Sequence, residues 1–194
     1  IPDYLKILNY DIELLSSDEL TFNKLKNYDV IITGVRFFNV NESSSKIVPF
    51  LMEYTKQGGN VIVQYNTSYR LKTKDFSPYP IKISRDRVTQ EDAPVTFLNS
   101  SHPVMNYPNK ILKEDFDSWV QERGLYFPNG WSKEYETIFS WNDIGEKPKK
   151  GSLLITKYGK GYYTYTGISF FRQLPQGVSG AYKLLVNIIS LNNE

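Results

Sequence analysis

The sequence predicts an α/β domain with a parallel sheet and an antiparallel hairpin near its C-terminus. Residues 1–66 alternate between helical and strand patterns, which is typical of a parallel sheet with right-handed crossovers. Within them, residues 29–34 and 60–65 each contain three successive apolar residues, at 30–32 and 61–63, which is typical of strands buried on both faces. Two further strand patterns, at 151–158 and 162–167, flank a glycine-rich turn of the kind that joins a hairpin.

The helices of the first third have recognisable starts and stops. Residues 2–9 form the first expected helix, with Pro2 in its first turn, and a short strand at 11–15 is expected to follow. Ser17 is a suitable N-cap for a second helix whose first turn is acidic. The helical spacing of residues 43–57 ends at a pair of glycines, which predicts the end of a third helix.

Residues 67–145 differ from the rest, because they are rich in Pro, Asn, Tyr and charge and have only short regular patterns. Such a long irregular span usually forms a functional surface or an interface. An amphipathic helix at 178–191 closes the chain, and we predict a single domain over 1–194 with this span as an insertion. The short patterns within the insertion are strands at 79–84, 95–98 and 137–141 and a helical turn at 113–118.

The composition excludes several classes of function. The 194 residues are 40% hydrophobic and carry a formal net charge of +2, so they can form a core but give no general argument for a nucleic-acid or membrane surface. There is no Cys, which excludes disulfides, thiolate nucleophiles and Cys-ligated metals. A single His excludes a zinc site with two His ligands from this chain, and we expect no metal and no cofactor.

The first candidate site follows from the predicted sheet. Ligands of open α/β sheets bind beyond the carboxyl ends of the strands. Three segments are expected at that edge, namely residues 34–39, 65–68 and 167–173. Their polar side chains suit a polyhydroxylated or anionic ligand, although the arginines are equally suited to capping loops and pairing with acids. The polar candidates are Arg36, Asn39, Asn66, Ser169, Arg172 and Gln173.

Two charged segments of the insertion add further candidates. If residues 84–89 form a strand, Arg85 and Arg87 share one face and Asp86 takes the other. Residues 119–124 place Glu122 and Arg123 beside Trp119. Such groups can bind a carboxylate, a phosphate or a sugar, but they can also form an ion-pair network that ties the insertion to the sheet.

The aromatic residues of the insertion and the one histidine each allow two interpretations of their role. The crowded aromatics of the insertion either stack on sugars and partners at the surface or form a small core under the loops. His102 is the only candidate general base of the imidazole type, but we expect it to bond locally or to cap a helical turn. The aromatics concerned are Trp119, Tyr126, Phe127, Trp131 and Trp141.

Several longer motifs carry a family resemblance. The runs YDVIITG (28–34) and LMEYTKQGGNVIV (51–63) resemble the class I glutamine amidotransferase-like fold, in the form found in ThuA-like proteins. More specifically, IKISRDRVT (81–89), DSWVQERGLYF (117–127) and YTGISFFRQLP (165–175) resemble the C-terminal region of large bacterial PIG-L (LmbE-like) deacetylases. The resemblance implies a three-layer, flavodoxin-like sheet, a first strand that precedes Ile1, and a chain that is a piece of a larger protein.

The catalytic residues of these families are missing here. Amidotransferases use a Cys after a strand, where this chain has Tyr65-Asn66, and the zinc site of PIG-L enzymes begins with His-Pro-Asp-Asp, where His102-Pro103 continues with Val104. We therefore expect a non-catalytic accessory domain that binds carbohydrate or docks on the deacetylase domain of its parent chain. The resemblance also implies a periplasmic or secreted location.

Two other functions remain open. An enzyme that uses Asp86 and Glu122 as an acid–base pair would act on glycans, and it requires the two carboxyl groups to face one site. A structural or oligomerisation module is the other alternative, since trimerisation domains of some β-galactosidases share the amidotransferase-like scaffold.

Overall fold

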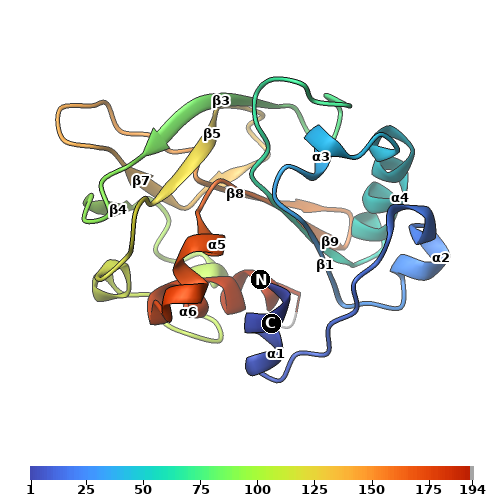
Figure 1. Cartoon of the computed structure of the whole chain (residues 1–194), viewed down its shortest axis with the longest axis horizontal. Coiled ribbons are helices and arrows are strands. Elements are labelled where there is room, and N and C mark those ends of the chain that lie inside the picture. Colours follow the sequence, from blue (N-terminus) through green and yellow to red (C-terminus); the bar gives the residue numbers. More distant parts are fainter. Residues whose placement is uncertain (193–194) are drawn as a thin grey trace.

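A mixed five-stranded sheet forms the centre of the structure, a computed structural model that describes residues 1–192 (Figure 1). β1, β2 and β9 are parallel neighbours, and β8 and β6 continue the sheet in antiparallel pairing, so the predicted hairpin is confirmed. The order across the sheet is β1 (Val30–Thr33), β2 (Asn60–Gln64), β9 (Gly161–Thr166), β8 (Leu153–Tyr158) and β6 (Glu136–Thr137).

The register explains why the central residues of β2 are apolar. Val63 of β2 lies opposite Thr33 of β1 and Tyr165 of β9, so the strand is hydrogen-bonded on both edges. All residues of β2 are buried, because both faces of the sheet are covered. The polar residues stand at the two ends of the strand: the amide of Asn60 donates to the carbonyl of Ile188 at 2.8 Å, and that of Gln64 donates to the carbonyl of Thr33 at 2.9 Å.

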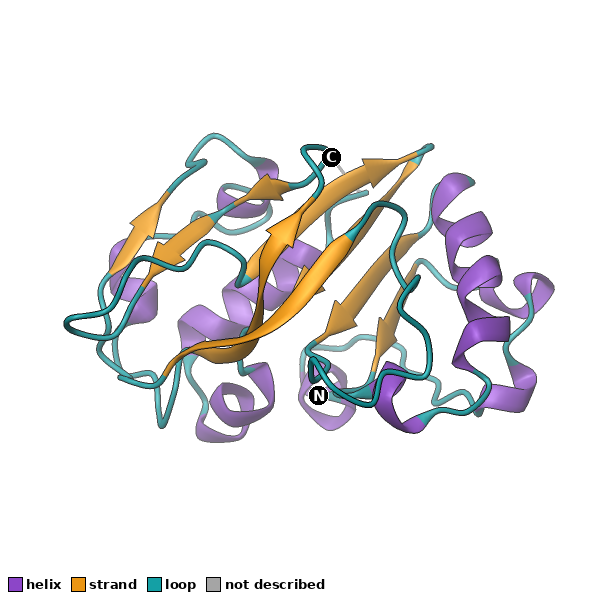
Figure 2. Ribbon diagram, turned by 90° about the horizontal axis from the view of Figure 1, so that it is seen from above, coloured by secondary structure: helices purple, strands orange, loops and turns teal. Residues whose placement is uncertain are grey.

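Helices cover both faces of the sheet and make three layers (Figure 2). One face packs against α4 (Ser44–Lys56) and α2 (Phe22–Leu25), in a cluster that contains Leu51 and Val61. The other packs against α6 (Ser179–Ile189) and α1 (Pro2–Ile7). No helix among residues 1–192 is long and apolar enough to cross a membrane.

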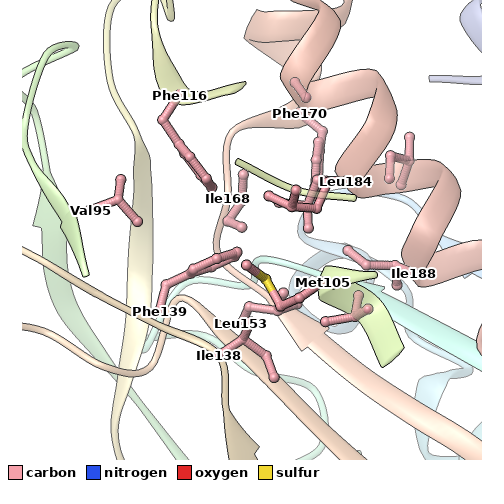
Figure 3. Close-up of a cluster of buried hydrophobic side chains, with 14 of the residues drawn as sticks. Val95, Met105, Phe116, Ile138, Phe139, Leu153, Ile168, Phe170, Leu184 and Ile188 are labelled. Atoms are coloured by element: carbon pink, nitrogen blue, oxygen red, sulfur yellow. The ribbon is translucent and has the colours of Figure 1, made fainter. Parts of the chain in front are cut away.

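The predicted insertion is an ordered layer beside the sheet. It contains two antiparallel pairs, and its apolar side chains continue the core under α6: Phe116 and Phe139 gather with Leu184 and Ile188 (Figure 3). The pairs are β3 (Ile81–Val88) with β5 (Gly124–Trp131) and β4 (Val95–Phe97) with β7 (Phe139–Trp141). The remaining short elements are α3 (Phe37–Val40), α5 (Phe170–Gln173), and the 3-10 turns Ser17–Glu19, Pro103–Met105, Lys113–Phe116 and Leu174–Gln176.

Several local expectations were wrong. Residues 11–15 form no strand, although Tyr10 and Ile12 still pack against the core. Ser16 caps the 3-10 turn in place of Ser17, and Thr21 caps α2. Residues 137–141 divide between β6 and β7, and β5 lies where no strand was expected. The sequence did not predict β5 because its pairing with β3 is non-local and irregular, so the strand has no alternating pattern in the sequence.

Candidate functional site

The three segments expected at the carboxyl ends of the parallel strands do meet. After β1, the backbone N–H of Arg36 donates to the carbonyl of Tyr65, which follows β2, at 2.8 Å. The rings of Tyr65 and Phe171, which follows β9, have centroids 5.6 Å apart. We call this surface the tyrosine–arginine edge, formed by Arg36, Tyr65, Tyr69, Arg85, Tyr126, Phe171 and Arg172.

Aromatic rings form the apolar part of the tyrosine–arginine edge. The half-buried rings of Tyr65 and Tyr126 stack with centroids 5.8 Å apart and an interplanar angle of 12°. Guanidinium groups cover two further rings: Arg172 lies 5.1 Å from the centre of Phe171, and Arg85 lies 5.9 Å from that of Tyr69. Such stacked contacts hold the two guanidinium groups over the rings.

Two polar groups of the edge have no partner in the described part of the chain. The Tyr65 hydroxyl makes no hydrogen bond, and the Arg36 guanidinium makes neither a hydrogen bond nor a salt bridge. Burial raises the pKa of Tyr65, with Arg36 and Arg172 opposing the shift and Glu122 adding to it. The phenol therefore stays protonated at neutral pH and can donate to a ligand.

Arg172 is oriented by two residues of the loop before β5. Its Nε donates to Glu122 Oε1 at 2.7 Å, and its Nη1 donates to the side-chain oxygen of Gln121. The side chain of Glu122 is only 12% exposed, whereas that of Arg172 is 36% exposed, so the acid is the more shielded member of the pair. Glu122 is thus occupied as a counter-ion, which makes it a poor general acid for the glycan-cleaving alternative.

Backbone strain is concentrated around the edge. Six non-glycine residues among 1–192 have positive φ, and four of them belong to the edge or its loops: Arg36 (61°), Arg70 (57°), Gln121 (64°) and Tyr126 (53°). Each such residue costs on the order of 1 kcal/mol or more, and this strain is typical of functional sites.

A buried tyrosine beneath the edge holds two of its segments together. The Tyr165 hydroxyl of β9 accepts from the Asn66 backbone N–H at 3.1 Å and donates to the Tyr126 carbonyl at 3.3 Å. Burial raises the pKa of Tyr165, so its hydroxyl keeps the proton that the second bond needs. The position of Tyr126, and with it the stack on Tyr65, therefore depends on β9.

Four of the predicted site residues support the edge from below. Asn39 and Asn66 are buried and bond to backbone: Asn39 Oδ1 accepts from Thr67 N at 2.8 Å, and Asn66 Oδ1 accepts from Phe38 N at 2.8 Å. Ser169 and Gln173 are also buried and bond to backbone groups of residues 120–122. These side chains shape the loops and do not face solvent.

Trp119 and Arg123 are not surface groups, so the expectation of an exposed aromatic at Trp119 was wrong. Trp119 is 3% exposed and donates from Nε1 to the carbonyl of Asp115 at 2.9 Å. Arg123 is also 3% exposed, and its guanidinium donates to backbone carbonyls and lies over three rings. The interpretation of a small core under the loops holds for Trp119, Phe127 and Trp141, which are all buried.

The other charged candidates stay at the surface. Arg85 and Arg87 of β3 are exposed and Asp86 between them is half-buried, as the predicted alternation requires.

His102 is buried and caps the turn Pro103–Met105, where its Nδ1 accepts from Val104 N at 3.0 Å. Its capping role is therefore confirmed.

Tyr65, Tyr69 and Phe171 were not among the candidate site residues, because only polar residues that follow the strands were considered as candidates. Tyr65 and Phe171 lie in segments that the pattern did place at this edge, so their position after a strand was the available signal. Tyr69 lies in the loop after β2 and Tyr126 lies in β5, and both reach the edge through long-range packing, which no local pattern reports. The hollow of about 450 Å³ lined by Tyr28, Tyr54 and the glycines before β2 lies at the opposite end of the strands.

The comparisons with known proteins show the fold. No protein family and no curated protein matches the sequence. The structure is similar to a ThuA-like protein from Bacteroides uniformis ATCC 8492, with a TM-score of 0.63 and 17% identity over 98% of this chain and 81% of that one. It is also similar to the mmIFT52 N-terminal domain, with a TM-score of 0.65 and 15% identity over 99% and 88%.

A third similar structure is Cytoplasmic Protein STM3548 from Salmonella typhimurium, with a TM-score of 0.63 and 15% identity over 97% of this chain and 83% of that chain. Identities this low establish a shared mixed α/β fold of the ThuA-like kind and nothing about activity. The scaffold implied by the sequence resemblance is thereby supported.

Proposed function

We propose that this domain is a non-catalytic binding domain that takes a carbohydrate on the tyrosine–arginine edge. The observation that carries the proposal is the unpartnered Arg36 guanidinium and Tyr65 hydroxyl beside half-buried rings. They lie beyond the carboxyl ends of parallel strands, where α/β sheets bind their ligands. Ring faces pack against the C–H faces of sugars, and guanidinium and phenol groups bond to sugar oxygens.

The chemistry of the chain favours binding over catalysis. The sequence contains no Cys, so the thiol chemistry of amidotransferases is not available on this scaffold. Glu122, which a carboxylate-based mechanism would use with Asp86, is held by Arg172. Both observations support a role in which the edge positions a glycan for another domain.

We further propose that this other domain is a PIG-L-type deacetylase in the same parent chain, in a periplasmic or secreted protein. The support is the resemblance of residues 81–89, 117–127 and 165–175 to the C-terminal region of such enzymes. Expression of the parent chain tests this: we expect a zinc-dependent N-acetyl-sugar deacetylase whose activity on polymeric substrate falls when this domain is deleted. A parent without a deacetylase domain would overturn the assignment.

Glycan-array screening followed by isothermal titration calorimetry tests carbohydrate binding. Tyr69 and Tyr107 are a matched pair, because their side chains are 46% and 45% exposed and only Tyr69 belongs to the edge. We expect Tyr69→Ala to weaken binding about fivefold, the loss of one aromatic contact of about 1 kcal/mol, and Tyr107→Ala to leave it unchanged. If the folded wild type binds no glycan, or if both variants behave alike, the proposal fails.

A further inference from the structure

We propose that the ligand of the tyrosine–arginine edge is an acidic sugar, whose carboxylate or sulfate is bound by Arg36 and the Tyr65 hydroxyl. This inference rests on the proposed carbohydrate binding and names the class of glycan. It follows from the charge at the edge and from the groups that lack a partner there.

The edge has more guanidinium groups than carboxylates. Arg36, Arg85 and Arg172 belong to it, and Glu122 is its nearby acid. Glu122 is bonded to Arg172, which leaves the charges of Arg36 and Arg85 uncompensated. Asp86 follows Arg85 along β3, and within the described residues its half-buried side chain forms no salt bridge with Arg85. A neutral sugar would leave this excess of positive charge without a partner.

The geometry suits a planar or tetrahedral oxyanion. A free guanidinium offers donors in a fixed fork that bonds to two oxygens of a carboxylate or sulfate at once. Arg36 is anchored for this role, because its backbone N–H donates to the Tyr65 carbonyl at 2.8 Å and thereby sets the two residues side by side. Its left-handed φ of 61° is part of the same turn.

Arg172 supplies a second, pre-oriented cation. It lies 5.1 Å above the ring of Phe171, whose centroid is 5.6 Å from that of Tyr65. Arg36 and Arg172 both act electrostatically on the Tyr65 hydroxyl, so an anion bound beside that hydroxyl would lie near both guanidinium groups. The stacked rings of Tyr65 and Tyr126 remain for the body of the sugar.

The test uses polymers that differ only in charge. Binding of the full chain is measured by calorimetry to polygalacturonate and to its neutral carboxyl-reduced form, and to dextran sulfate and to neutral dextran. We expect the better acidic polymer to bind about tenfold more tightly than its neutral partner, because hydrogen bonds to a charged oxyanion are stronger than those to a neutral hydroxyl. The preference should fall at high ionic strength.

Arg36→Gln is the decisive variant, since the exposed side chain has no salt bridge to lose. It should abolish the preference for the acidic polymer while leaving the neutral form unaffected. Lys6→Gln is the control, because it removes the same charge from exposed α1, which lies beside the C-terminal end of α6 (Figure 1). It should retain the preference.

The outcomes separate the two proposals. Equal binding of acidic and neutral forms overturns the acidic-sugar inference and leaves carbohydrate binding standing. An equal effect of Arg36→Gln and Lys6→Gln also overturns the inference, because it shows an unspecific charge effect. Binding to neither form overturns the proposed function together with the inference.

Discussion

Arg123 is a buried cation whose replacement by methionine should destabilise the domain strongly. Its guanidinium is 3% exposed and donates to the carbonyl of Ala93 at 2.8 and 3.2 Å and to the carbonyl of Phe116. It also lies 5.4 Å from the ring centre of Trp119 and 6.0 Å from that of Trp141. Burial lowers the pKa of Arg123 to about 10, so the group is still charged at neutral pH.

The magnitude follows from the bonds that are lost. Methionine leaves two buried carbonyls without a donor, at about 1–3 kcal/mol each, and loses the cation–π contacts. Part of this loss is offset, because the variant no longer needs to bury a charge. We expect a net decrease of about 3 kcal/mol in the free energy of unfolding, which is roughly 6–12 °C in melting temperature for a chain of this size.

Urea unfolding followed by tryptophan fluorescence measures this effect, since Trp119 and Trp141 lie against the substituted side chain. Arg87→Met is the control, because Arg87 is exposed and has neither a hydrogen bond nor a salt bridge within residues 1–192; it should change stability by less than about 0.5 kcal/mol. An Arg123→Met protein as stable as the wild type would refute the reasoning. It would mean that desolvation of the guanidinium cancels its bonds, as known for some buried ion clusters.

The same unfolding assay tests three further changes. Tyr165→Phe leaves the Asn66 N–H without its acceptor and should cost about 1 kcal/mol while weakening glycan binding; unchanged values for both would contradict its supporting role. Gly124→Ala should cost about 2 kcal/mol, because its Cβ would lie 2.4 Å from the Gly167 carbonyl oxygen; normal stability would show that the backbones move apart. Burial lowers the pKa of His102 in the folded protein, so protonation of the unfolded histidine lowers the free energy of unfolding as the pH falls from about 6.5 toward that lowered pKa; His102→Asn should flatten this decline, and an unaltered slope would exclude the histidine.

The candidate site was only partly predictable from the sequence. The rule that ligands bind beyond the ends of parallel strands correctly brought Arg36 and Arg172 to one edge. It did not reveal that Arg36 is free whereas Arg172 is paired, because Glu122 comes from a loop 50 residues away in the chain. Trp119 and Arg123 show the reverse case, since residue types common at binding surfaces form a buried core here.

The sequence by itself determined the parallel core strands, the hairpin of β8 and β9, the main helices α4 and α6, and the absence of thiol chemistry. These features depend on local periodicity and on composition, which each segment carries alone. Only the tertiary structure decided the pairing of β3 with β5, the burial of Trp119, and the stack of Tyr126 on Tyr65. Such contacts join residues far apart in the chain, and their energy comes from packing that no single segment encodes.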